Sequence, residues 1–541
     1  MRLLWLTAIA ISACNIPYFL YFSKNINSSI WNWTEYGTTT LGMLLGEQSY
    51  YPIMAGYLLT AILFVFLTIK VQRHFSLSQT GKPNSPNTKA VWPKRMADML
   101  GVLIVTCISV GLCLLGIRGR TGYNPIKVSA AYYCHDTFLN QLGINPSFNL
   151  LSTTLDNLMP VDEARQECIT QMGRPLAYTL IPGGKHASEL KGRNVILILM
   201  ESMSYSLMGH GQTPFLDSLA HKSLFFSRCY SAGNHTNHGI FSTLYSFPAL
   251  MFRNLMKGSN IPHYQGLPSV LHDHGYRNLF FMTHESQYDN MNAFLRTNGY
   301  DDIYAQENYP RKEVVNSFGV PDHFLYRYAL QKLQQQKQPF MATLLSISNH
   351  PPYVIPEWFH ANSEEEELQI VEYADDALRI FFKQAAEQPW YGNSVFVLLG
   401  DHGKLTGTPE CEMPQCLNHI PLIIHAPGLP AEEIDSWCMQ MDVQPTLLSL
   451  LGIRAEQEHF GQNILQKPRS MALYTADNMI GARSDGHLYI YEPGTGTEWF
   501  YKSAADNKVV YCEEPDSTLL YMKRTLFSTL QTAQEEIKKH E

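Results

Sequence analysis

One threonine, Thr236, stands between two histidines in the stretch CYSAGNHTNHGIFSTLYSFP, residues 229–248. The Gly and Asn residues predict a loop, and the apolar run after Gly239 predicts that this loop enters a helix at about Asn237. A threonine hydroxyl is a weak nucleophile at its ordinary pKa, so Thr236 needs a base or a metal ion beside it. The start of a helix also offers backbone N–H groups to an anion such as phosphate. We therefore take Thr236 as the candidate nucleophile, while His235 and His238 could act as acid or base or only shape the loop.

Polar side chains follow four predicted strands. They are Glu201, His284, His350 and the pair Asp401–His402. Ligands of an open α/β sheet bind beyond the carboxyl ends of its strands, so residues distant in sequence can meet there. Two carboxylates, one imidazole and a hydroxyl suit Mn²⁺, Mg²⁺ or Zn²⁺. Glu201, Asp401 and His402 are therefore predicted to form a cation site beside Thr236, where the cation would activate the hydroxyl.

Apolar runs that could form the supporting strands alternate with helical patterns from Asn194 onward. The runs cover residues 194–200, 277–283, 341–347, 393–399 and 420–426. Helical patterns lie between them at 213–223, 321–336, 365–386 and 442–452, and a charged amphipathic helix is expected at about 516–540. Such alternation predicts an α/β fold with a mostly parallel sheet and helices on both faces.

Seven stretches together resemble the lipoteichoic acid synthase and phosphoglycerol transferase branch of the alkaline phosphatase and sulfatase superfamily. They are NVILILMES, GNHTNHGIFSTLYSFP, SISNHPPY, YADDAL, LLGDHG, IPLIIHAPG and DVQPTLLSLLGI. The likeness covers roughly residues 118–465 and implies an alkaline phosphatase/sulfatase-like fold preceded by transmembrane helices. It also implies that Glu201, Thr236, Asp401 and His402 hold one divalent cation, usually Mn²⁺ in this branch.

The resemblance further implies that Thr236 is transiently esterified by a headgroup taken from a membrane phospholipid. A glycan or lipid of the cell envelope would then accept that headgroup. His350 and His284 match positions that contact the headgroup phosphate in the family. Relatives specific for glycerol phosphate have a Trp and an Arg shortly after the equivalent of His284, whereas this chain has Asp289 and Met291 in those places.

Four alternatives remain open from the sequence. Phosphoethanolamine transferases use a similar threonine and metal, and a phosphodiesterase-like hydrolase would resolve the Thr236 ester with water. A sulfatase is disfavoured because the nucleophile region lacks a Cys or Ser in a C/S-x-P-x-R setting. A catalytically inactive binding module is disfavoured because all four expected metal ligands are present.

The first 117 residues are predicted to be a membrane domain. Three apolar runs, residues 3–22, 51–69 and 99–117, each approach the length that a membrane-spanning helix needs. Six basic residues lie between the second and third runs, which places that loop in the cytoplasm and everything after residue 117 outside. The alternative for the first run is a cleaved signal sequence ending at Cys14. We expect a connector at 118–190, a catalytic domain at 191–465 and a further extracytoplasmic part at 466–541, in a multi-pass protein of a bacterial-type inner membrane.

Charge and cysteine content agree with an extracytoplasmic catalytic part. Residues after 120 hold 30 basic and 45 acidic side chains, which argues against a nucleic-acid partner. Seven of the ten cysteines lie outside the predicted membrane domain, as suits an oxidising compartment. Cys411 with Cys416 and Cys134 with Cys168 are candidate disulfides.

Overall fold

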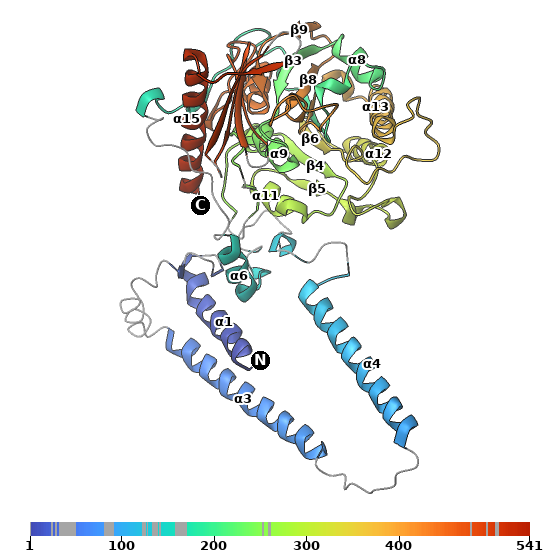
Figure 1. Ribbon diagram of the computed structural model, residues 1–541, viewed down its shortest axis with the longest axis vertical. Coiled ribbons are helices and arrows are strands. Elements are labelled where there is room, and N and C mark those ends of the chain that lie inside the picture. Colours follow the sequence, from blue (N-terminus) through green and yellow to red (C-terminus); the bar gives the residue numbers. More distant parts are fainter. Residues whose placement is uncertain are drawn as a thin grey trace. The chain divides into compact units, whose positions relative to one another are not determined.

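The structure of the 541-residue chain is a computed structural model. It describes residues 2–22, 25–26, 30–31, 50–79, 91–121, 126, 128–131, 139, 142–156, 170–251, 254–257, 261–476, 479–493, 496–503 and 508–540. By its internal contacts the chain divides into two compact units, Met1–Leu158 and Met159–Glu541. Figure 1 shows the helices of the first unit and the sheets and helices of the second.

The first unit contains three long helices. They are α1 (Arg2–Phe22), α3 (Tyr51–Gln79) and α4 (Val91–Arg118). Among the described residues, two segments are long and apolar enough to cross a membrane, Arg2–Phe19 and Tyr51–Arg73. The third predicted span is helical, but its apolar stretch in the described residues, Leu103–Cys113, is shorter. Length and composition therefore support two of the three predicted spans.

The second unit is built on a nine-stranded sheet in the order β10-β3-β8-β7-β2-β6-β4-β5, with β9 also paired to β3. Its strands are β2 (Asn194–Met200), β3 (Leu224–Tyr230), β4 (Arg277–Met282), β5 (Asp302–Tyr304), β6 (Phe340–Leu345), β7 (Ser394–Gly400), β8 (His419–His425), β9 (Glu432–Ile434) and β10 (Cys438–Met439). Only β8 runs antiparallel to its neighbours β3 and β7. The prediction of a mostly parallel sheet is confirmed.

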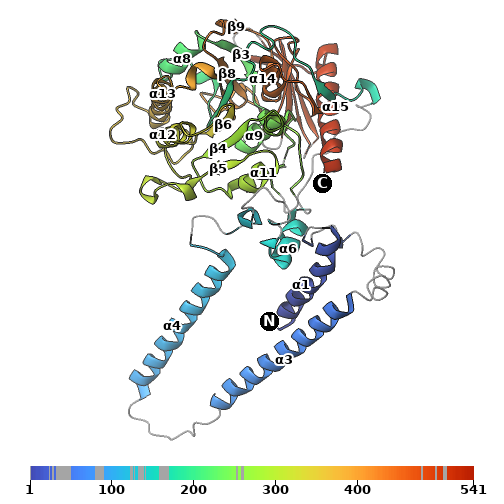
Figure 2. The same cartoon turned by 180° about the vertical axis from the view of Figure 1, so that it is seen from behind.

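Helices cover both faces of this sheet, because its central strands are apolar on both sides. Along β2, Val195, Leu197 and Leu199 belong to one hydrophobic core, while Ile196 and Ile198 belong to the other. The first core contains α9 (Thr236–Tyr245), α10 (Leu267–Asp273), α11 (Met291–Thr297) and α14 (Val443–Leu450). The second contains α8 (Pro214–Ala220), α12 (Asp322–Leu333) and α13 (Glu366–Ala385), which lie together in both views (Figures 1 and 2).

A second sheet, absent from the sequence prediction, follows the catalytic part. Its five antiparallel strands are β12 (Ala472–Ala476), β13 (Met479–Ser484), β14 (His487–Glu492), β15 (Thr497–Ser503) and β16 (Val509–Tyr511). The predicted terminal helix forms α15 (Ser517–His540), which packs against β13 and β14. Within the segment predicted as a connector, β1 (Ala177–Leu180) pairs with β11 (Ala455–His459).

The candidate disulfides are not formed where the structure describes the cysteines. Cys411 and Cys416 are both free thiols. The Sγ of Cys411 donates to the Met413 carbonyl at 3.2 Å, and the Thr406 N–H donates to the Sγ of Cys416 at 3.4 Å. Cys134 and Cys168 lie outside the described residues.

His419 begins β8 inside a column of stacked rings. Its ring centroid lies 4.3 Å from that of Tyr205 and 4.9 Å from that of Tyr230. Its Nε2 donates a hydrogen bond to the Ser227 carbonyl at 2.8 Å. Burial lowers the pKa of His419 to about 4, so the imidazole is neutral at neutral pH.

We expect the His419→Phe variant to lose less stability in acid than the wild type. The unfolded imidazole titrates near its ordinary pKa and the folded one near 4, so the stabilising contribution is present above about pH 6.5 and is lost as the pH falls through 4. Its full size is about 3 kcal/mol, and phenylalanine keeps the stack without titrating. Melting temperatures at pH 7 and pH 4.5 measure the difference, with substitution of the exposed His210 as control. Equal acid sensitivity of His419→Phe and wild type would contradict this prediction.

Candidate active site

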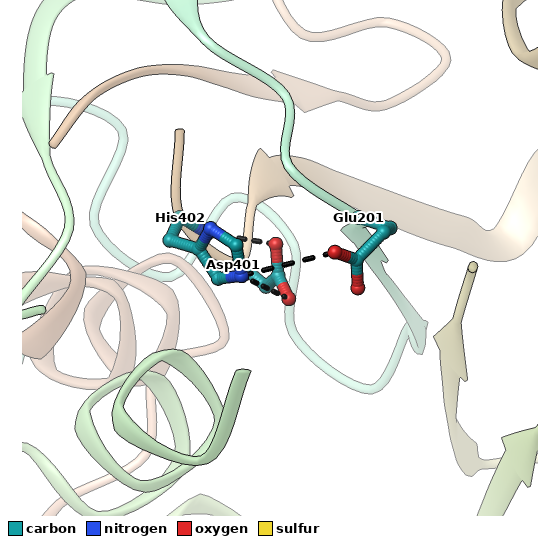
Figure 3. A group of neighbouring side chains, drawn as sticks. All are labelled: Glu201, Asp401 and His402. Atoms are coloured by element: carbon teal, nitrogen blue, oxygen red, sulfur yellow. Dashed lines mark hydrogen bonds and ion pairs between the residues drawn. The ribbon is translucent and has the colours of Figure 1, made fainter. Parts of the chain in front are cut away.

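Two neighbouring parallel strands deliver the acidic residues of the site. Met200 of β2 and Gly400 of β7 are register partners, and Glu201 and Asp401 come directly after them. His402 follows on the same loop. The potential ligand atoms of Glu201, Asp401 and His402 all lie within 4.8 Å of one another. Figure 3 shows the three side chains pointing toward one another. The structure thus brings together these three of the residues predicted to form the cation site.

Both carboxylates are buried and only partly satisfied by hydrogen bonds. Asp401 Oδ1 accepts from the backbone N–H groups of Ser202, at 2.9 Å, and His402, at 2.7 Å. Glu201 Oε1 accepts from the Ser202 hydroxyl at 2.7 Å. In contrast, Glu201 Oε2 and Asp401 Oδ2 are buried without a hydrogen-bond partner. Burial and the neighbouring Asp401 carboxylate raise the pKa of Glu201. Two buried acidic oxygens without partners fit a divalent cation, which would offset their mutual repulsion.

The imidazole of His402 is oriented toward the two carboxylates. Its Nδ1 lies 2.8 Å from the Gly403 carbonyl and donates to it, which leaves Nε2 as an acceptor. Nε2 lies 3.6 Å from Asp401 Oδ2 and 3.8 Å from Glu201 Oε1. These separations exceed hydrogen bonds but suit three ligands of one ion, and a ring held through its other nitrogen is typical of metal-binding histidines.

Thr236 is the first residue of α9, as its position before an apolar run predicted. Its side chain is half-buried. One turn later Gly239 lies against the strand end, where a Cβ on this glycine would stand 2.2 Å from the Asp401 carbonyl oxygen. The start of α9 therefore packs directly on the segment that carries Asp401.

Gln440, which the sequence analysis did not single out, links the Thr236 loop to the acidic strand end. Its buried side chain accepts from the Ala232 N–H at 2.9 Å. It also donates to the carbonyls of Gly400, at 2.9 Å, and Asp401, at 2.7 Å. A buried amide with three backbone partners holds both segments in one geometry. It is the first residue of η10 (Gln440–Asp442), directly after β10, and no motif pointed to it.

His284 and His350, the predicted phosphate contacts, lie in a cluster of rings. The ring centroids of His284 and Tyr288 are 4.7 Å apart, and those of His350 and Phe318 are 4.2 Å apart. Burial lowers the pKa of His284, and the nearby His350 contributes in the same direction. Burial raises the pKa of Tyr288 to about 12, with contributions from Asp289 and Glu201. The ring cluster thus lies close enough to Glu201 to interact electrostatically, although neither histidine belongs to the three-residue group.

A lysine and an asparagine that were not predicted also hydrogen-bond around the backbone that carries Glu201. Lys404 Nζ donates to Asn349 Oδ1 at 2.8 Å, and burial lowers the pKa of the lysine. Asn349 donates in turn to the carbonyls of Glu201, at 3.2 Å, and Ser202, at 3.1 Å. Asn349 lies inside the stretch SISNHPPY, next to His350, and Lys404 directly follows the stretch LLGDHG, so proximity to those motifs could have indicated them.

We expect Gly239→Ala to weaken divalent-cation binding by about tenfold, because the new methyl group must displace the Asp401 backbone. Mn²⁺ affinity measured by calorimetry checks this. Gly392→Ala is the matched control, since a Cβ there would meet nothing within 4 Å. Unchanged affinity in Gly239→Ala would contradict the close packing of α9 on the acidic strand end.

Comparison with known proteins agrees with this architecture. Residues 193–453 match the sulfatase family model. Lipoteichoic acid synthase 1 of Bacillus subtilis (strain 168) is 27% identical over 354 residues, covering 58% of this chain and 55% of the relative. A lipoteichoic acid synthase of Staphylococcus aureus (strain USA300) is 24% identical over 498 residues, covering 84% of this chain and 72% of the relative. The chain spans about half the length of the B. subtilis relatives that it matches.

Two solved structures share the fold. The lipoteichoic acid synthase LtaP from Listeria monocytogenes superposes with a TM-score of 0.59 at 21% identity, covering 70% of this chain and 99% of that one. A protein of the alkaline phosphatase superfamily from Vibrio parahaemolyticus also reaches 0.59, at 24% identity, over 67% of this chain and 90% of that one. The predicted fold class is therefore confirmed.

Proposed function

Because the chain belongs to the lipoteichoic acid synthase-like branch of the alkaline phosphatase and sulfatase superfamily, we propose that it is a metal-dependent phosphoglycerol transferase. It moves the headgroup of a membrane phospholipid to a glycan or lipid acceptor of the cell envelope. The observation that carries this proposal is the pair of unpartnered buried oxygens of Glu201 and Asp401, close to the helix that begins at Thr236.

Glu201, Asp401, His402 and the hydroxyl of Thr236 would hold the cation, which we propose to be Mn²⁺. When bound, it lowers the pKa of the hydroxyl and polarises the phosphoryl group. Thr236 Oγ attacks phosphorus, a new O–P bond forms, and the bond from phosphorus to the diacylglycerol oxygen breaks. An acceptor hydroxyl then attacks the same phosphorus and releases Thr236.

The other residues of the site bind and orient the headgroup. N–H groups in the first turn of α9 donate toward the charge that develops on the phosphoryl oxygens. His284 and His350 would contact the headgroup phosphate from the ring cluster. Gln440 keeps the Thr236 loop at a fixed position relative to Asp401. Holding the nucleophile in the correct position accounts for a large part of the lowering of the activation barrier in such a site.

Membrane anchoring is part of the proposal, because the donor is a lipid. The segments Arg2–Phe19 and Tyr51–Arg73 would hold the protein in the cell membrane. Helix α4 would make the third crossing that leaves the catalytic unit outside the cytoplasm. A multi-pass anchor keeps the site near the surface where the donor headgroups lie.

Peptide mass spectrometry of the full-length protein tests the proposal. The protein, in nanodiscs with Mn²⁺, is incubated with phosphatidylglycerol or with phosphatidylethanolamine. A glycerophosphoryl adduct on Thr236 is the expected result. Headgroup release from phosphatidylglycerol at equal rates with and without acceptor would instead identify a hydrolase. An adduct on another residue, or none with either lipid while Mn²⁺ is bound, would overturn the proposed function.

A phosphoethanolamine headgroup is the second candidate, and one feature of the site favours it. Asp289 stands where glycerol phosphate-specific relatives have a Trp, and a carboxylate could bind an ammonium group. However, Asp289 already pairs with Lys257 at 2.9 Å, so its charge is offset. A phosphoethanolamine adduct on Thr236 in the same experiment would select this candidate.

A further inference from the structure

A cavity of about 530 Å³ lies in the second unit and is separate from the catalytic group. Its lining comes from η4 (Tyr205–Leu207), β3, η9 (Gln415–Leu417), the start of β8, β9 with the segment that follows it, and the end of β13 with the turn after it. None of Glu201, Thr236, Asp401 and His402 lines it. The proposed reaction at Thr236 therefore does not involve this cavity.

The floor of the cavity is a buried arginine with spare hydrogen-bonding capacity. Arg483 is 3% exposed, and its Nη1 donates to Gln415 Oε1 at 3.1 Å. The same glutamine donates to the Tyr230 hydroxyl at 2.7 Å. The Nε of Arg483 is buried without a hydrogen-bond partner. That nitrogen is fully enclosed, so a ligand oxygen in the cavity would accept from the other N–H groups of the guanidinium, which lines the cavity.

One wall of the cavity consists of stacked rings. The ring centroid of Tyr230 lies 4.9 Å from that of His419 and 5.2 Å from that of Trp437. The guanidinium of Arg228 lies 5.4 Å from the centre of the Trp437 ring. Aromatic rings beside polar groups suit a ligand that is apolar on one side and rich in oxygen on the other.

The cations of the cavity are already paired, which argues against an anionic ligand. Arg228 contacts Asp435 at 2.7 Å and Asp485 at 2.6 Å. Arg483 faces Glu410 at 3.5 Å, and Glu433 adds a further carboxylate to the lining. A phosphate or carboxylate ligand would be repelled, because the carboxylates of the lining outnumber the positive charges that are not already paired. Hydroxyl groups, in contrast, can donate to Asp435 and Asp485 and accept from Arg483.

We propose that this cavity binds a neutral saccharide through hydrogen bonds to Arg483, Asp435 and Asp485 and through contact with the ring wall. That the saccharide belongs to the glycan acceptor rests on the proposed function, whereas the binding itself does not. The cavity would hold the acceptor in a place distinct from the lipid headgroup, so donor and acceptor need not compete.

Calorimetric titration of the full-length protein with maltose or gentiobiose tests this, in a detergent without a sugar headgroup. We expect saturable binding with a Kd on the order of 1 mM, weakened by about tenfold or more in Arg483→Gln. The double variant Asp435→Ala/Asp485→Ala should weaken it similarly. Its two side chains are 67% and 75% exposed, so this variant is expected to fold.

Thr236→Ala is the matched control and should bind both disaccharides like the wild type. Three outcomes would overturn the proposal: no binding of either sugar, equal binding by the cavity variants, or displacement of the sugar by inorganic phosphate. Because no turnover is measured, each of these leaves the Thr236 adduct experiment untouched. Failure of that adduct with sugar binding intact would remove only the role of the saccharide as acceptor.

Discussion

Thr236→Ala is expected to lower headgroup transfer by about 10⁴-fold or more, because it removes the atom that forms the covalent ester. The adduct seen by mass spectrometry should vanish with the activity. Mn²⁺ binding should weaken less than activity falls, since the two carboxylates and His402 remain in place. Headgroup release from phosphatidylglycerol and adduct formation are the two measurements.

Thr236→Ser is the matched variant that separates chemistry from structure. It keeps the hydroxyl at the start of α9 and should retain the adduct, with a rate between those of wild type and Thr236→Ala. The change removes one methyl group from a half-buried position, so the melting temperature should hardly move. A Thr236→Ala protein with wild-type activity would refute the assignment of the nucleophile.

The core of the fold could be predicted from sequence because its strands are buried on both faces. Such strands read as continuous apolar runs, and residues 194–200 coincide with β2. The polar residues that follow the runs then fall at one sheet edge by geometry alone, which is why Glu201, Asp401 and His402 meet. The direction of β8 could not be predicted in this way, since a buried run reads the same in either direction.

The second sheet and the supporting amides escaped prediction for different physical reasons. Strands β13, β14 and β15 mix polar with apolar residues, so no continuous apolar run stands out. Gln440 acts through hydrogen bonds to backbone atoms of segments far away in sequence. Such partners are set by the tertiary fold, and no local pattern marks the residue that provides them.

The second large prediction concerns the cation site. We expect Asp401→Asn to affect the stability of the metal-free and the metal-bound protein in opposite directions. Without metal, the substitution removes one of two buried acidic groups that repel each other, so we expect the stability of the variant to equal or exceed that of the wild type. With Mn²⁺ at about 100 times its Kd, the wild type should gain about 2.7 kcal/mol, whereas the variant should gain little. Headgroup transfer should fall with the lost metal.

Melting curves in EDTA and in Mn²⁺ measure both halves of this prediction. Glu432→Gln is a suitable control, because Glu432 pairs with Lys185 at 2.6 Å on the surface and should keep the full response to Mn²⁺. Loss of stability in metal-free Asp401→Asn, together with an intact Mn²⁺ response, would contradict the site. In that case the buried oxygens of Glu201 and Asp401 would serve the fold rather than a cation. The predicted result is unchanged or raised stability without metal and a lost response to Mn²⁺. It would mean that the Glu201 and Asp401 carboxylates repel each other in the metal-free protein and that a bound cation relieves this repulsion.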